Sequence, residues 1–206
     1  MKYWIYSNSH RLCEISVVHE GKLLFLVLLV SETARKLLEK EEKLKKTTDE
    51  NGWSPLHYAA YYFRPRRVAV LEYFRCKILL EYDASAAYIA ETEKKRTALH
   101  IAAIRGHVEK MKEIVSRCPA CCDLVDNRGW NALHYAVASK DTKAFEECMK
   151  IPELLRLKTE KDDKGNTPFH LIAALAREQK QWRHVFYKYC YGEGDIYGLN
   201  KHQRHL

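Results

Sequence analysis

The chain has 206 residues, is 47% hydrophobic and carries a net charge of +8, the composition of an ordinary soluble protein with room for a substantial core. Its positive charges are spread over residues 64–77, residues 94–96 and a basic C-terminal tail. Because no recognition motif accompanies this spread, it disfavours a nucleic-acid partner and favours an acidic protein partner.

The N-terminal stretch gives no clear structural signal. Residues 1–20 show neither helical nor strand periodicity, so we expect a poorly defined segment there. The apolar run at residues 23–30 is far shorter than the roughly 20 residues of a membrane-spanning helix. Glu14 and Glu20 precede it, which argues against a signal peptide. Without a leader, seven cysteines at irregular spacing favour reduced thiols in a cytoplasmic protein.

A short pattern occurs four times and divides the rest of the chain. It reads Ser-Pro-Leu-His-Tyr-Ala-Ala from Ser54, and variants of it begin at Thr97, Asn131 and Thr167. Its first residue can cap a helix, because its side chain can accept a backbone N–H of the first turn. The histidine three residues later can bind back to the cap, as the glutamate of a capping box does. We expect these two roles for Ser54, His57, Thr97, His100, Asn131, His134, Thr167 and His170.

A motif of this kind with a period near 33 residues is typical of the ankyrin repeat, a helix-turn-helix unit that stacks on its neighbours. The sequence therefore predicts an all-α ankyrin-repeat solenoid of four recognisable repeats plus a degenerate N-terminal one. We expect an ankyrin-repeat domain at residues 21–191, with units at about residues 21–48, 49–91, 92–125, 126–161 and 162–191, and an exposed C-terminal tail at residues 192–206.

A turn precedes three of the four caps. Each begins with an aspartate (Asp49, Asp126 or Asp162) and has a glycine three residues later. The glycine permits positive φ, and the aspartate can hydrogen-bond its own turn. In the second copy Thr92 takes the aspartate position and Lys95 the glycine position, so we expect a looser turn there.

The second helices are less regular than the first ones. In the long first repeat, Pro65 is expected to end the first helix, since the residue before a proline avoids the α region. The second helix is then predicted from Arg67 to Glu81. Further second helices are predicted around Met111 and Phe145, and residues 182–191 are expected to supply the last one.

Over roughly residues 31–200 the repeats resemble plant ankyrin proteins of the accelerated-cell-death type. The resemblance rests on residues 49–60, on Cys118-Pro119-Ala120-Cys121-Cys122 and on residues 195–200. It implies a cytosolic ankyrin array in defence or stress signalling, followed by a multi-pass membrane domain, the PGG domain. This chain stops before any such domain, so the resemblance implies a truncated member. Attachment to the cytosolic face of the plasma membrane then requires a missing C-terminal domain beyond Leu206.

Two chemical alternatives compete with this interpretation. Each motif histidine lies beside its own cap, which favours capping over metal binding. Cys118 and Cys121 form a C-x-x-C pair next to Cys122, but structural zinc normally needs four ligands and no second pair exists. A thioredoxin-like pair would open a helix after a strand, whereas this one follows a helix. We therefore predict no enzyme, catalytic residue, cofactor or metal, with a zinc- or thiol-dependent protein using Cys118 and Cys121 as the less favoured alternative.

The predicted function is a non-enzymatic scaffold for another protein, with no nucleic acid and no small-molecule substrate. The alternative is a soluble remnant of a membrane-anchored ankyrin signalling protein. Specificity should come from the turn tips, the residues before the caps and the helix ends after the alanine pairs, which would line a concave groove suited to an acidic segment with an apolar anchor. These positions are Glu50, Asn51, Trp53, Tyr61, Tyr62, Lys94, Arg96, Ile104, Arg105, Asn127, Arg128, Trp130, Asp163, Lys164 and Asn166.

Trp53 and Trp130 leave a further choice open. Each directly precedes a cap, and a tyrosine (Tyr58 or Tyr135) stands at the fourth position of the helix that follows. This is the spacing of a hydrophobic staple, which is purely structural. Tryptophan and tyrosine are also favoured at binding hot spots, so partner contact is the second interpretation.

Overall fold

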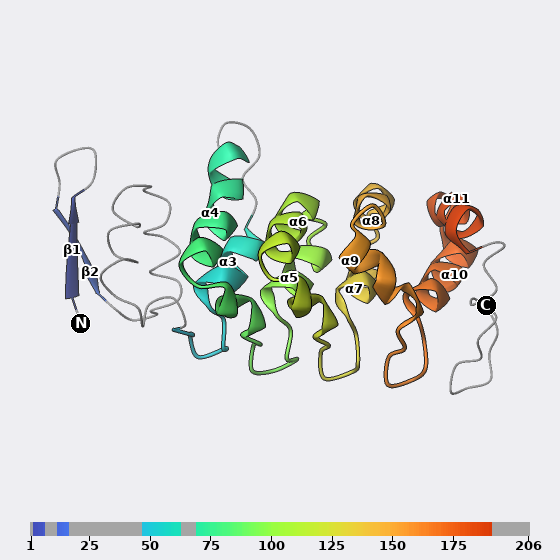
Figure 1. Ribbon diagram of the computed structural model, residues 1–206, viewed down its shortest axis with the longest axis horizontal. Coiled ribbons are helices and arrows are strands. Elements are labelled where there is room, and N and C mark those ends of the chain that lie inside the picture. Colours follow the sequence, from blue (N-terminus) through green and yellow to red (C-terminus); the bar gives the residue numbers. More distant parts are fainter. Residues whose placement is uncertain (1, 7–11, 17–46, 63–68, 191–206) are drawn as a thin grey trace.

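The computed structural model describes residues 2–6, 12–16, 47–62 and 69–190 (Figure 1). The degenerate repeat expected at residues 21–48 lies almost wholly outside these ranges, as does the expected tail. Four helical hairpins follow one another along the long axis, and the turns between them project from one edge (Figure 1).

Each hairpin supplies a first and a second helix. The first helices are α3 (Pro55–Tyr61), α5 (Ala98–Ile104), α7 (Ala132–Ala138) and α10 (Pro168–Glu178). The second helices are α4 (Ala69–Tyr82), α6 (Val108–Arg117), α8 (Thr142–Cys148) and α11 (Lys180–Tyr189), with a short α9 (Pro152–Leu155) after α8. First helices pack on first helices and second helices on second helices, from each repeat to the next. The predicted solenoid is confirmed for the four recognisable repeats.

Small side chains pack between the first helices of neighbouring repeats, and large side chains pack between the second helices. The alanine pairs Ala59–Ala60 and Ala102–Ala103 are fully buried, and their small size lets neighbouring first helices approach closely. Met111, Phe145 and Trp182 fill the space between second helices and are likewise fully buried. Burial of one such large apolar side chain contributes about 1.5–3 kcal/mol. The core is therefore continuous from repeat to repeat.

Two helix boundaries differ from the sequence prediction. α4 (Ala69–Tyr82) ends one residue later than the predicted Glu81, while the predicted start at Arg67 and Pro65 lie outside the described residues. α11 spans Lys180–Tyr189, two residues earlier than predicted at both ends. The extended backbone of Gln179 (φ −128°, ψ 119°) ends α10 and allows the next helix to begin directly after it.

The N-terminal residues contain a hairpin that the sequence did not reveal. Strands β1 (Lys2–Tyr6) and β2 (Leu12–Ser16) pair in antiparallel fashion, with Lys2 opposite Ser16 and Tyr6 opposite Leu12. Aromatic and β-branched residues favour strands. The run of apolar residues at positions 3–6, however, hides the polar–apolar alternation by which a strand is recognised. The all-α expectation thus omitted one short sheet.

The first repeat ends α3 without a glycine turn. Two side chains at the start of α6 satisfy the free carbonyls instead: Lys110 Nζ donates to Ala59 O at 2.7 Å and also to Tyr62 O, and His107 Nδ1 donates to Ala60 O at 2.9 Å. The Lys110 side chain is buried. A cation at a helix C-terminus is favoured by the helix dipole, which offsets part of the cost of burying this charge.

Candidate protein-interaction surface

The turn surface consists of the fifteen residues expected above to contact a partner, and aspartates shape the backbone of its turns. Asp126 Oδ1 accepts hydrogen bonds from Arg128 N and Trp130 N, both at 2.8 Å. Asp49 and Asp162 accept the two equivalent amides in their own turns. One carboxylate therefore holds each of these turns in a fixed conformation.

The turns are also hydrogen-bonded to one another. Asp163 N donates to Arg128 O at 3.0 Å, and Thr92 N donates to Asn51 O at the same distance. Gly129 has a φ of +76°, and a Cβ added there would lie 2.8 Å from Asp163 N. The glycine is thus required both by its backbone conformation and by the approach of the next turn.

The expectation of a looser second turn was wrong. Glu91, not Thr92, takes the part of the aspartate: its side chain accepts from Glu93 N at 3.0 Å and from Lys94 N at 2.8 Å. The turn is one residue longer than the others, and the longer glutamate side chain spans it. Lys95 adopts the positive φ of the glycine position, at +60°. Asn127 N donates to Lys94 O at 3.0 Å, so this turn joins the others.

Two of the motif histidines, His57 and His134, connect their own caps to the following repeat. His57 Nδ1 accepts from Ser54 N at 3.2 Å, and the other ring nitrogen, Nε2, donates to Arg96 O at 3.0 Å. His134 makes the same pair of bonds, to Asn131 N and to Asn166 O. Capping boxes are present at all four caps. A neutral imidazole with its proton on Nε2 satisfies both bonds, so these histidines are structural links.

His100 departs from this pattern. Its Nδ1 accepts from Thr97 N at 3.0 Å, but its buried Nε2 forms no hydrogen bond of ordinary geometry with the described residues, and only weak interactions with the backbone of Leu124 and Trp130 oppose the effect of burial on its pKa. Burial lowers the pKa of His100 to about 4, and it also lowers the pKa values of His57 and His134. All three rings are therefore neutral near pH 7.

Two tryptophans form the aromatic part of the turn surface. Trp53 lies 5.2 Å from the Tyr58 ring and 5.5 Å from the Tyr61 ring, measured between ring centroids. The Trp130 and Tyr135 ring centroids are separated by a similar distance, 5.3 Å. Both tyrosines at the fourth helical position are buried, whereas both tryptophans are only half-buried. The staple contact is present, and part of each indole is left accessible.

Arginines lie over these rings. The Arg128 guanidinium is 4.2 Å from the centroid of Trp130, and Arg105 is 4.8 Å from the centroid of Tyr61. Trp130 Nε1 donates to Asp162 Oδ2 of the next repeat at 3.0 Å, which fixes the indole from the other side. Such cation–π contacts contribute about 0.5–1 kcal/mol at exposed sites.

The charges beneath Trp130 form a connected group. Tyr135 Oη donates to Asp126 Oδ2 at 2.7 Å, and Arg128 Nε donates to the same oxygen at 3.2 Å. Burial alone would raise the pKa of Asp126, but the hydrogen bonds from Tyr135, Trp130 N and Arg128 lower it below its usual value. Burial, followed by the bond to Asp126, raises the pKa of Tyr135 to about 12. This group holds Arg128 in place under neutral conditions.

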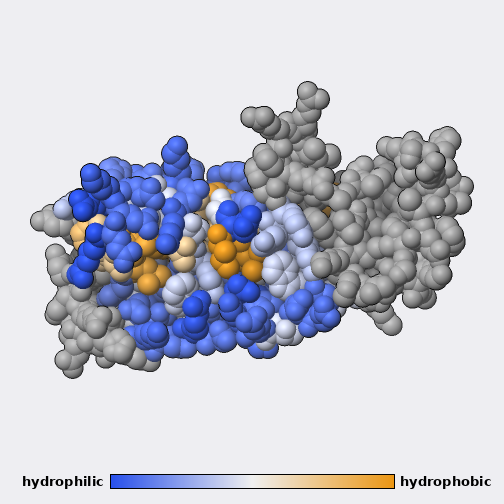
Figure 2. All heavy atoms as spheres, turned by 180° about the vertical axis from the view of Figure 1, so that it is seen from behind, coloured by the Kyte–Doolittle hydropathy of each residue, from blue (hydrophilic) through white to orange (hydrophobic). Residues whose placement is uncertain are grey.

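The exposed and partly buried members of the turn surface fall into two sets. Trp53, Arg96, Ile104, Trp130 and Asn166 are partly buried, and the remaining ten are exposed. The lower edge, where the turns project, is mainly hydrophilic when the molecule is viewed from behind (Figure 2). The roles of Glu91 in the second turn and of His107 and Lys110 at the end of α3 were not identified from the sequence. The acidic side chain of Glu91 could have indicated its role, because it binds amides two and three residues away. His107 and Lys110 bind carbonyls 47 and 51 residues away, and no local pattern indicates such contacts.

The three cysteines of the C-x-x-C segment lack the solvent exposure of a reactive thiol. Cys118, Cys121 and Cys122 are buried. The hydrogen bond between Cys121 and Cys122 raises the pKa of Cys121 and lowers the pKa of Cys122, but both sulfurs are buried away from any substrate. Across the described ranges, with their gaps, no three His, Cys, Asp or Glu side chains come together in a group that could hold a metal ion. In the same ranges no helix combines the length and hydrophobicity needed to span a bilayer.

Comparison with known proteins gives two findings. Residues 68–151 match the family model described as "Ankyrin repeats (3 copies)". The chain is also 26% identical over 159 residues to the Target of rapamycin complex 2 subunit AVO2 of Saccharomyces cerevisiae, an alignment that covers 74% of this chain and 32% of AVO2. The chain thus spans about a third of the length of that relative. The repeat geometry and the family match together show that the described repeats form an ankyrin array.

Proposed function

We propose that this array is a non-enzymatic scaffold that binds a protein partner through its turn surface. The observation that carries the proposal is the repeated tryptophan arrangement. Each indole packs on a buried tyrosine, and part of it stays exposed to solvent. A purely structural staple does not require this exposed part, so it is available for contact with a partner. Rigid, partly exposed aromatic side chains bind with little loss of conformational entropy, which is why they dominate binding hot spots.

The charges around the rings support an acidic segment with an apolar anchor as the partner. Arg105 and Arg128 lie beside Tyr61 and Trp130, and Lys94 and Lys164 are exposed on neighbouring turns. Charges at the rim of an interface mainly raise the association rate, whereas desolvated aromatic side chains mainly slow dissociation. An apolar side chain packed against the accessible parts of Trp53 and Tyr61 would place acidic neighbours within reach of these cations.

Two observations support a role without chemistry. The motif histidines have their ring nitrogens committed to caps, and His57 and His134 also to the following repeat. The thiols of the Cys118 to Cys122 segment are buried. Neither set has the exposure that a nucleophile or general base requires.

The biological setting is part of the proposal. The resemblance to plant proteins of the accelerated-cell-death type supports defence or stress signalling. The similarity to AVO2, which is named as a complex subunit, supports a place within a multiprotein assembly. A remnant of a membrane-anchored signalling protein is the alternative, and sequence beyond Leu206 would decide between them.

Selection from a displayed random-peptide library on the intact chain tests the proposal. Selected peptides should carry an apolar residue flanked by Asp or Glu. The double variant Trp53→Ala, Trp130→Ala should then weaken binding by about 2–4 kcal/mol, measured by calorimetry. The variant Tyr61→Ala, Tyr62→Ala, at exposed positions, serves if the tryptophan variant unfolds.

Lys143→Ala on α8 is the matched control, because Lys143 is exposed and lies outside the turn surface. It should leave binding unchanged. If bound peptide instead protects the second helices around Met111 and Phe145 from hydrogen exchange, the turn surface is not the binding site.

A further inference from the structure

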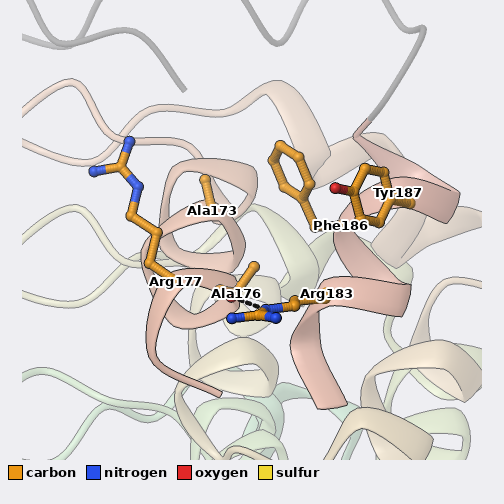
Figure 3. Close-up of a pocket in the computed structure, with 6 residues that line it drawn as sticks. All are labelled: Ala173, Ala176, Arg177, Arg183, Phe186 and Tyr187. Carbon is orange, nitrogen blue, oxygen red and sulfur yellow. Dashed lines mark hydrogen bonds between the residues drawn. The ribbon is translucent and has the colours of Figure 1, made fainter. Parts of the chain in front are cut away.

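We propose that the end pocket, a cavity of about 340 Å³ between α10 and α11, binds an acidic peptide segment of a partner protein through an aliphatic side chain. α10 contributes Ala173, Ala176 and Arg177, and α11 contributes Arg183, Phe186 and Tyr187 (Figure 3). No residue of the turn surface lines this pocket, so the two sites are independent.

The pocket lies at the edge of the buried face of α11, where that face is incompletely covered. Trp182 and Val185 are buried, and Trp182 contacts Phe145 of the preceding repeat at 5.8 Å between centroids. Phe186, one turn after Trp182, lies at the edge of the same face, packs in part against the core and lines the pocket, whereas Tyr187 next to it is 63% exposed. The two alanines of α10 are too small to fill the space in front of Phe186 (Figure 3). The space has the size and the apolar floor of a site for one side chain.

The charges at the pocket decide which segment fits. α11 carries four basic side chains, Lys180, Arg183, His184 and Lys188, and no acidic one. Lys188 is paired with Glu146 at 3.0 Å, and His184 lies 3.8 Å from the same carboxylate. Within the described part of the chain, neither Arg177 nor Arg183 has a carboxylate partner. Both guanidiniums therefore favour an anionic ligand.

The geometry of Arg183 supports a bidentate contact. Its Nε donates to Ala176 O at 3.3 Å, which ties the guanidinium to α10 across the mouth of the pocket (Figure 3). The two terminal nitrogens face no acidic side chain of the described residues, and a guanidinium recognises a carboxylate through two parallel N–H groups. An aliphatic side chain on the alanines, with a carboxylate on either side, would meet Arg183 and Arg177 together.

A labelled peptide with the sequence Asp-Glu-Leu-Asp-Glu is the probe, measured by fluorescence anisotropy against the full chain at low and moderate salt. Two control peptides replace the acids by Asn and Gln, or the leucine by Ser. Each should bind at least about fivefold more weakly. On the protein side, Arg177→Gln with Arg183→Gln should lower affinity by about tenfold or more.

Lys180→Gln is the matched control, because Lys180 is an exposed cation of the same helix that does not line the pocket. It should change affinity by less than about twofold. An equal loss in this variant would mean diffuse attraction to a basic surface and would overturn the proposal, as would undetectable binding of the leucine peptide. Circular dichroism of each variant checks the fold.

Three further variants distinguish the end pocket from competing sites and occupants. If Trp53→Ala, Trp130→Ala abolishes binding and the arginine variant does not, the peptide occupies the turn surface and the pocket proposal fails. If Glu193→Gln, Asp195→Asn raises the affinity by more than about threefold, acidic residues of this chain compete for the site and a partner is not its occupant. A concentration-dependent dimer that Arg177→Gln dissolves would assign the pocket to a second copy and also overturn the proposal.

Discussion

Among the described residues, two buried side-chain nitrogens have no hydrogen-bond partner of ordinary geometry, Trp182 Nε1 and His100 Nε2, and only the second belongs to a titratable group. The His100 ring is buried and neutral. Burial lowers the pKa of His100 from 6.5 to about 4. In the unfolded chain the same imidazole regains its ordinary pKa, so protonation favours unfolding.

We therefore expect stability to fall as the pH is lowered from about 6.5 to about 4. Above pH 6.5 the ring is neutral in both states and the contribution is fully present; it is lost as the pH falls toward the folded-state pKa. The cost attributable to His100 is about 3–4 kcal/mol, because its pKa falls from 6.5 to about 4 and each pKa unit corresponds to roughly 1.4 kcal/mol. Urea unfolding across this range measures it, and His100→Gln should flatten the curve. An unchanged slope in that variant would contradict the assignment.

Glycines in the turns allow a second test at this scale. Gly129→Ala places a Cβ 2.8 Å from Asp163 N in addition to the positive φ, so the free energy of unfolding should fall by about 2–4 kcal/mol. Gly106→Ala is the control: φ is +66°, but the nearest atom lies at 3.4 Å, and the loss should be only about 1 kcal/mol. Thermal unfolding of both variants measures the difference, and equal losses would show that φ alone matters.

At the scale of elements, local signals were predictable and distant ones were not. The capping boxes at Ser54 and Thr97 follow from residues three positions apart, and the structure contains them. The second turn was misjudged because a one-residue insertion moved the acidic role from position 92 to Glu91. The contact of Lys110 with Ala59 joins residues 51 positions apart, and no periodicity indicates such a pair.

The contribution of the contact between α6 and the end of α3 can be measured by replacing Lys110. Lys110→Met would leave the carbonyls of Ala59 and Tyr62 without their donor, and we expect a loss of about 2–3 kcal/mol in the free energy of unfolding. Lys112→Met, on the same helix, removes only an ion pair to the exposed Glu109 and should cost less than about 0.5 kcal/mol. Chemical denaturation measures both. Similar losses would mean that the charge, rather than the bridge to α3, is what stabilises.

For the whole molecule, stability should be graded along the stack. In a repeat array each unit contacts only its neighbours, so units flanked on both sides are held more firmly. Native-state hydrogen exchange should therefore show slower exchange in α5 and α7 than in α11. Uniform protection over these three helices would indicate a single cooperative unit. The four-repeat architecture was predictable because its motif repeats, whereas the end pocket was not, since it depends on how one helix pair departs from the pattern.

The hydrogen bonds between turns give the molecule a direction. In each pair of neighbouring turns, a backbone N–H of the later turn donates to a backbone carbonyl of the earlier one. The three pairs are Thr92 N to Asn51 O, Asn127 N to Lys94 O and Asp163 N to Arg128 O. By the same register, Glu50 N stands at one end of the series formed by the described turns and Lys164 O at the other. The two ends are therefore chemically unlike: a repeat grafted after α11 must present an N–H to Lys164, whereas one grafted before α3 must present a carbonyl to Glu50. Two identical ends cannot satisfy each other in this way, so the series favours head-to-tail extension and disfavours symmetric end-to-end pairing through its turns.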